Sequence, residues 1–173
     1  MPRRVTRLLE LSDVEELTEL LRVNRDFLKP WSPAWDDEFF TVERQQELAH
    51  DALELHRAGS MVPWVICDEH GRVAGRLNLN GIVRGALQSA AVGYWVGEQF
   101  NGQGLAGHAA AEAVAHSRDV LGLHRLQAET LVHNIASQRV LEKNGFSRYG
   151  MAPEYLKIDG TWQDHLMYQH ILF

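Results

Sequence analysis

Apolar and polar positions alternate with helical spacing in two stretches near the start of the chain. The first stretch predicts a helix through about Arg25, with Ser12 as its N-cap and Glu15 completing a capping box. The second predicts a helix over 41–58 that is ended by Gly59. The side chains expected to face the core are Val14, Leu17, Leu20 and Leu21 in the first helix and Val42, Leu48, Ala52 and Leu55 in the second.

Strand patterns dominate the middle of the chain, and helices and strands alternate after it. The predicted strands are Val5–Glu10, Met61–Asp68, Arg72–Val83, Ser89–Val96, His124–Leu131, Phe146–Gly150 and Trp162–Leu172. Two further helices are predicted over 104–121 and 134–144, ended by Gly122 and Gly145. Hairpins followed by a β-α-β-α-β tail predict a mixed α/β sheet with helices on both faces.

Composition narrows the class of protein. The 173 residues contain no repeat or flexible linker, so we expect one domain over 1–173 with a single core. A net charge of −6 argues against a nucleic-acid binder. The longest apolar run, Met61–Cys67, is far short of the roughly 20 residues that span a bilayer, and no signal-peptide core is present. A lone Cys67 excludes an internal disulfide. We therefore expect a cytoplasmic protein without a membrane partner.

A glycine-rich loop precedes the helix predicted over 104–121. In Gly102–Gly107 two glycines allow a sharp turn, and the helix start offers unpaired N–H groups to an anion such as a pyrophosphate. An ordinary strand-to-helix turn is the plain alternative. The loop also matches the G-x-G-x-x-G dinucleotide fingerprint, with Glu129 about 20 residues further on. That match is disfavoured because Gly97–Asn101 separates the loop from its strand and because a dinucleotide loop belongs to the first βα unit. No NTPase P-loop motif occurs.

Two motifs in order resemble those of the GNAT acetyltransferase superfamily. The segment Asn101–Ala106 is similar to the acyl-CoA loop [QR]-x-x-G-x-[GA], with Asn101 at the Gln/Arg position, and Asn134–Phe146 is similar to N-x-x-S-x-x-x-L-x-x-x-G-F. Within the superfamily the chain resembles the RimJ/RimL group of ribosomal-protein N-terminal acetyltransferases, and most closely its alanine-acetylating RimJ branch. The segments that carry this likeness are Asn24–Pro33, Val83–Gly85, Val92–Gly97 and Glu154–His165.

The resemblance implies the acyl-CoA N-acyltransferase fold, with a mixed, mostly antiparallel central sheet of about seven strands. It implies an N-acetyltransferase that uses acetyl-CoA as cosubstrate, needs no metal, and acetylates the N-terminal α-amino group of a protein, a ribosomal one among the candidates, by direct attack in a ternary complex. Two alternatives stay open: an acetyltransferase of a small amine such as a polyamine, amino acid or antibiotic, or a non-catalytic acyl-CoA-binding or ribosome-assembly protein. A homodimer is also left open.

The same resemblance assigns the site residues. Those expected to bind the cosubstrate are Trp95, Val96, Gln103, Gly104, Leu105, Ala106, Gly107, His108, Asn134 and Ser137. The predicted catalytic groups are Glu154 as base, Ser137 beside the departing sulfur, and the Val96 N–H as oxyanion donor. By residue type and not by resemblance, Phe27, Leu28, Trp31 and Trp35 are candidates for the lip of the acceptor site, with core packing as the alternative. Arg25 and Arg84 are candidates to bind the acceptor's backbone or acidic groups, with surface solvation as the alternative.

Each assignment has a simpler structural alternative. Asn134 could serve only as a helix N-cap, and Glu154 could be a solvated turn carboxylate. Cys67, on a predicted interior strand, is expected to pack in the core and not to act as a nucleophile. Of nine histidines only His165 lies near the proposed chemistry, and no H-x-x-x-H or H-E-x-x-H spacing occurs, so no metal site is predicted.

Overall fold

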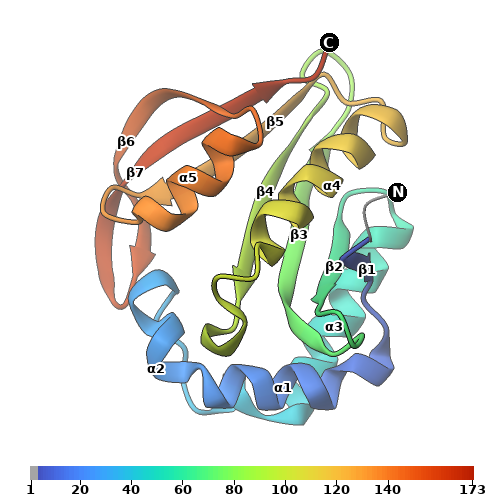
Figure 1. Cartoon of the computed structure of the whole chain (residues 1–173), viewed down its shortest axis with the longest axis vertical. Helices are drawn as coiled ribbons and strands as arrows, with labels where there is room; N and C mark the ends of the chain where they lie inside the picture. Colours follow the sequence, from blue (N-terminus) through green and yellow to red (C-terminus); the bar gives the residue numbers. More distant parts are fainter. Residues whose placement is uncertain (1–3) are drawn as a thin grey trace.

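A seven-stranded sheet with helices on both faces forms the structure, a computed structural model that describes residues 4–173 (Figure 1). The strands are β1 (Thr6–Leu8), β2 (Val62–Cys67), β3 (Val73–Val83), β4 (Ser89–Val96), β5 (Arg125–Leu131), β6 (Ser147–Ile158) and β7 (Thr161–Ile171). The helices are α1 (Val14–Val23), α2 (Arg25–Leu28), α3 (Val42–Arg57), α4 (Leu105–Asp119) and α5 (Ile135–Lys143). Short 3₁₀ turns occupy Leu11–Asp13, Lys29–Trp31, Glu38–Phe40 and Glu98–Phe100.

The sheet is split along one strand pair. Its order is β1-β2-β3-β4-β5-β7-β6, and every neighbouring pair is antiparallel except β4 and β5. These two parallel strands pair only where Ser89–Ala91 faces Arg125–Gln127, and beyond those positions they are not paired. Figure 1 shows the two halves of the sheet separating toward the end that α1 and α2 cross. The predicted mixed, mostly antiparallel sheet is confirmed.

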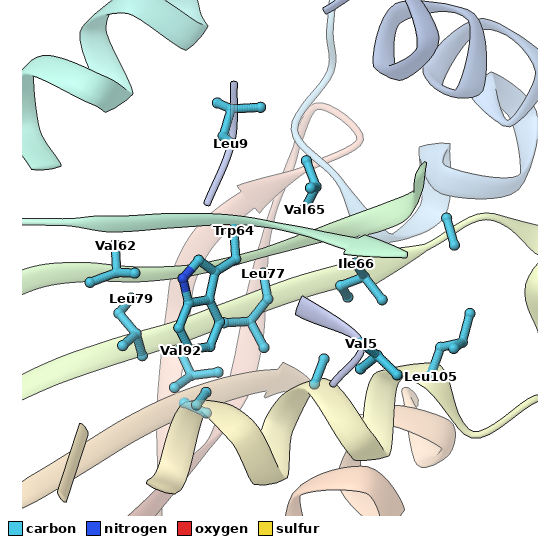
Figure 2. Packing of buried hydrophobic residues seen from close by; sticks show 14 of the residues in the cluster. Val5, Leu9, Val62, Trp64, Val65, Ile66, Leu77, Leu79, Val92 and Leu105 are labelled. Atoms are coloured by element: carbon cyan, nitrogen blue, oxygen red, sulfur yellow. The ribbon is translucent and has the colours of Figure 1, made fainter. Parts of the chain in front are cut away.

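Helices cover the two faces in pairs. Helix α1 packs with α3 on one face, and α4 packs with α5 on the other. Figure 2 shows Trp64, Leu77 and Val92 pointing toward α4, whereas Val65 points to the opposite side. Both Val65 and Leu77 are fully buried, because β2 and β3 are the inner strands of the half of the sheet that runs from β1 to β4. Strand periodicity therefore assigns each side chain of β3, β4 and β5 to a known face.

The N-terminal elements differ from the prediction. The strand is confined to Thr6–Leu8, and the capping box joins Glu10 and Asp13 in place of Ser12 and Glu15. The reason is electrostatic, since Asp13 accepts the Glu10 N–H at 2.8 Å and pairs with the Arg7 guanidinium at 2.6 Å. A carboxylate so well bonded outcompetes a serine hydroxyl for the same cap.

Two later predictions also need correction. In α3 Ala52 is buried and Val42 packs against the core as predicted, but Leu55 is 48% exposed, and Gln45 and Ala49 are buried in addition. Gln45 is buried because its amide donates to the Phe39 carbonyl at 2.6 Å. Strand β6 continues to Ile158 and not Gly150, because it forms a long hairpin with β7 that tolerates two bulges. No helix within residues 4–173 has the length and apolar character to cross a membrane.

Candidate active site

Two cavities meet at the split between β4 and β5. The loop cavity, about 640 Å³, lies beside the glycine-rich loop and α5, and the sheet cavity, about 580 Å³, lies between the strands and α3. Six residues line both cavities: Leu28, Trp31, Tyr94, Trp95, Asn134 and Ser137. The two spaces therefore share a wall at the point where the sheet opens.

Backbone groups form one side of the loop cavity. Gly102 and Gly104 have φ values of +79° and +73°, which favour glycine, and Gly104 is the N-cap of α4 without any capping side chain. The first intrahelical bond is donated by the His108 N–H to the Gly104 carbonyl at 3.0 Å. The N–H groups of Leu105, Ala106 and Gly107 consequently have no partner within the helix and, together with the helix dipole, can hold an anion.

A backbone donor points into the split. The Gly97 N–H donates to the Ala74 carbonyl of β3 at 2.8 Å. Successive N–H groups of a strand point to opposite sides, so the Val96 N–H points away from β3. On that side β5 no longer pairs with β4, which leaves this N–H facing the gap between the halves. A carbonyl oxygen placed in the split would meet a fixed hydrogen-bond donor there.

Two hydroxyl groups join the shared wall. The Tyr94 hydroxyl lies 2.9 Å from Ser137 Oγ and donates to the Ser137 carbonyl at 3.3 Å. Burial raises the pKa of Tyr94 to about 12, so this phenol is neutral in ordinary buffers. The Asn134 amide oxygen accepts a hydrogen bond from the Ser137 N–H at 3.1 Å, so Asn134 is the N-cap of α5, the structural role predicted from the sequence as the alternative. Sequence reasoning did not single out Tyr94, although it lies in the strand segment that precedes the loop.

The sheet cavity is mostly apolar but contains three charged side chains, Asp51, Arg76 and Glu129. Glu129 lies on β5 two positions beyond the last residue paired with β4, on the same face as Gln127. Burial raises the pKa of this carboxyl. Sequence reasoning considered Glu129 only as part of the disfavoured dinucleotide fingerprint. The signal it missed is the period of two in 125–131, which places Glu129 on the face opposite the buried Leu126 and Ala128.

Most of the residues expected to bind the cosubstrate lie together. Eight of them line the loop cavity: Trp95, Val96, Gly104, Leu105, Ala106, Gly107, Asn134 and Ser137. Gln103 and His108 belong to the same loop and first helical turn but do not line the cavity. The apolar residues expected at the acceptor, Phe27, Leu28 and Trp31, line the loop cavity, and the last two also line the sheet cavity.

Two predicted acceptor arginines lie outside both cavities. Arg25 forms an ion pair with Asp37 at 2.7 Å and lies over the Phe40 ring, whose centroid is 4.5 Å away. Arg84 follows β3 at the closed end of the sheet and donates to the Leu121 carbonyl after α4. Local acid and carbonyl partners hold both guanidinium groups away from the split, so their role in acceptor binding has no geometric support.

Glu154 and Cys67 are also remote from the shared wall. Glu154 is not in the turn before the last strand pair but inside β6, at a bulge with φ of +46°, where it is exposed. Its N–H donates to Asp164 Oδ1 at 2.8 Å, and its side chain lines neither cavity. Cys67 is half-buried on β2 away from both cavities, and burial raises the pKa of its thiol. Within the described residues no group of three His, Cys, Asp or Glu side chains could hold a metal.

Comparisons with known proteins agree with this geometry. Residues 3–147 match a family model described as an acetyltransferase (GNAT) domain. The chain is 36% identical to a probable N-acetyltransferase, YjcK, of Bacillus subtilis, covering 91% of this chain and 87% of that protein. It is 32% identical to the ribosomal protein uS5-alanine N-acetyltransferase of Escherichia coli, covering 95% and 86%. The structure of Mycobacterium smegmatis RimJ in complex with CoA-disulfide superposes with a TM-score of 0.92 at 30% identity, covering 96% and 80%.

Proposed function

The chain belongs to the GNAT acetyltransferase family and is an acetyl-CoA-dependent N-acetyltransferase, and we propose that its acceptor is the N-terminal α-amino group of a ribosomal protein. The relative from Escherichia coli is named for alanine acetylation of ribosomal protein uS5, and this likeness spans nearly the whole chain. A ribosomal acceptor would place the reaction in the cytoplasm. The observation that carries the proposal is the pair of cavities that meet where β4 and β5 separate.

The loop cavity fits the cosubstrate. Its unpaired amides at Leu105, Ala106 and Gly107 suit a pyrophosphate, and Gly104, whose left-handed φ favours glycine, adds no side chain to that cradle. Bound acetyl-CoA supplies an activated acetyl thioester. The chain's own contribution at this end is the Val96 N–H, which would stabilise negative charge developing on the carbonyl oxygen.

The sheet cavity suits an amine that needs little activation. An α-amino group has a pKa near 7.7–8.0, about 2.5 units below that of a lysine side chain, so a carboxylate of modest basicity can remove its proton. Glu129 faces this cavity beside the split, and we assign it as the proton acceptor. Glu154, which the sequence resemblance favoured, stays a prediction without support from its exposed position.

The reaction is proposed to be a direct transfer. The amine nitrogen forms the new bond to the acetyl carbon, Glu129 takes the amine proton, and the carbon–sulfur bond breaks. The Ser137 hydroxyl, which lies beside Tyr94, is positioned to donate a hydrogen bond to the leaving sulfur. The sole cysteine, Cys67, lines neither cavity, so an acetyl-cysteine intermediate has no geometric basis.

An acceptor panel tests the proposed function. Purified enzyme and acetyl-CoA are incubated with short peptides that begin with Ala, Ser, Met or Thr, with the same peptides blocked at the N-terminus, and with polyamines and free amino acids. Mass spectrometry locates the acetyl group. Acetylation at the α-amino group of the Ala or Ser peptides, absent from the blocked ones, supports the proposal. Faster turnover of a small amine, or modification of an internal lysine, would contradict it.

A further inference from the structure

Arg76 is a half-buried cation that lines the sheet cavity and has no acidic partner among residues 4–173. Its side chain leaves β3 on the face that carries Asn78, and its Nη2 donates to the Asn78 amide oxygen at 3.2 Å. Its Nε atom is buried and has no hydrogen-bond partner. Over residues 4–173 no carboxylate forms an ion pair with this guanidinium. The strongest donor in the cavity is therefore left with unused capacity.

Two other arginines of this chain have acidic partners. Arg7 pairs with Asp13 at 2.6 Å, and Arg72 pairs with Asp68 at 2.6 Å. Burial lowers the pKa of Arg76, with no opposite charge to offset the cost, yet a guanidinium stays protonated in proteins. An unpaired, half-buried charge is destabilising, and Arg76, unlike Arg125, lines a cavity that a ligand can enter. A ligand that supplies the missing anion explains it.

We propose that Arg76 binds a carboxylate of the acceptor, so that the sheet cavity selects an N-terminus with an acidic side chain close behind it. The inference rests on the proposed function, because it describes a further part of the same acceptor. The planar guanidinium offers several N–H donors in a fixed geometry, which matches a carboxylate better than it matches a neutral amide.

The spacing of the strands indicates where the acidic residue lies. Arg76 is on β3 and Glu129 is on β5, with β4 between them, so their backbones are at least about 10 Å apart. Gly93 of β4 lies between them on the same face and has no side chain. A Cβ placed on Gly93 would have one neighbouring atom within 4 Å, Asn80 Nδ2 at 3.7 Å. The floor of the cavity is thus open along this line. An extended peptide rises about 3.3 Å per residue, which places the carboxylate within roughly the first four residues.

Peptides matched in all but one residue test the proposal. Each begins with the N-terminal residue that the enzyme acetylates best and carries Glu or Gln at position 2, 3 or 4. We expect one Glu position to lower KM by about 10- to 100-fold relative to Gln, with kcat little changed, because a charge-assisted bond remote from the reacting atoms acts on binding. Equal KM values for all Glu and Gln peptides in the wild-type enzyme would overturn the proposal.

Three variants assign the effect to this guanidinium. Arg76→Met should abolish the preference for Glu, and Asn78→Asp should abolish it as well, since the new carboxylate would occupy Arg76 from within the chain. Arg125→Met is the control, because Arg125 also has a buried Nε without a partner but lines neither cavity and lies over the Tyr149 ring at 5.2 Å. It should keep the preference.

Thermal unfolding separates recognition from structure. Both Arg76→Met and Asn78→Asp remove or neutralise an unpaired, half-buried charge, so each should unfold at the wild-type temperature or above it. A marked loss of stability in both variants would show that Arg76 serves the fold, and would overturn the proposal. A wild-type enzyme that acetylates no peptide contradicts the proposed function, whereas equal use of Glu and Gln peptides contradicts only this inference.

Discussion

The loop cavity and the sheet cavity share a wall but are built in different ways. The loop cavity takes its anion-binding N–H groups from the backbone of one continuous segment at the start of α4, Leu105 to Gly107. The sheet cavity takes its charged groups from side chains on α3, β3 and β5, which are far apart in the sequence. The difference teaches that main-chain atoms suit a chemical group that all substrates share, whereas side chains from separate elements let a cavity change its acceptor through single substitutions.

Removing the carboxylate of Glu129 should have the largest effect on turnover. Glu129→Gln should lower kcat by about 1000-fold at neutral pH, because loss of a general base commonly costs two to four orders of magnitude. Burial raises the pKa of Glu129, so wild-type kcat should fall as the pH drops through a value above the usual Glu pKa of about 4.3, where the base becomes protonated. Steady-state kinetics across pH measure both effects.

Glu154→Gln is the matched control for that comparison. Glu154 is an exposed carboxylate at a bulge of β6, and we expect wild-type kcat from this variant. Rising pH should partly restore Glu129→Gln, since more of the acceptor amine is then unprotonated. If Glu154→Gln loses turnover and Glu129→Gln does not, the base belongs to the β6 hairpin, and the sheet cavity has been assigned the wrong role.

A substitution at Gly104 tests whether the loop cavity binds CoA, because the backbone there has a φ that residues other than glycine rarely adopt. Gly104→Val places a β-branched residue at a φ of +73°, so the cradle must rearrange and the Kd for CoA should rise by about 100-fold. Calorimetry measures the affinity, and circular dichroism confirms that the variant is folded. Gly85→Val carries a similar strain at φ of +69° in the distant turn after β3 and should bind CoA normally. Equal loss in both variants would attribute the effect to general destabilisation.

Substitutions in the wall that the two cavities share should lower kcat by an intermediate amount. Ser137→Ala should lower kcat by about 10- to 100-fold with CoA affinity almost unchanged, because the hydrogen bond to sulfur strengthens as the bond breaks. Tyr94→Phe removes the hydroxyl 2.9 Å from Ser137 Oγ and should cost about threefold to tenfold. Combining both substitutions should cost little more than Ser137→Ala alone. Additive losses would show that the two hydroxyls act independently.

The smallest effect is expected outside both cavities. Cys67→Ala should keep at least about half of wild-type kcat, because direct transfer leaves the thiol without a role. Double-reciprocal plots with both substrates varied should intersect, as a ternary complex requires. Parallel lines together with acetylated Cys67 in the mass spectrum would replace direct transfer with a covalent relay.

The sequence predicted the loop cavity better than the sheet cavity for a physical reason. Gly102 and Gly104 are adjacent to the helix whose start they shape, so their meaning can be read locally. Arg76 and Glu129 meet in one cavity only because β4 separates from β5 after Ala91, and strand pairing over that distance leaves no local motif. The order of helices and strands was predictable from periodicity. The Glu10–Asp13 cap was not, because it depends on an ion pair between β1 and the turn that follows it.

The contact between the loop cavity and the sheet cavity has a consequence for the order in which substrates bind and products leave. In the proposed reaction the cosubstrate would fill the loop cavity and the acceptor the sheet cavity, so neither would need to pass through the space that the other fills. Spent CoA can depart and be replaced while a bulky protein still occupies the acceptor side. Product inhibition should reflect this independence, with CoA competing against acetyl-CoA alone and the acetylated peptide competing against the unmodified peptide alone.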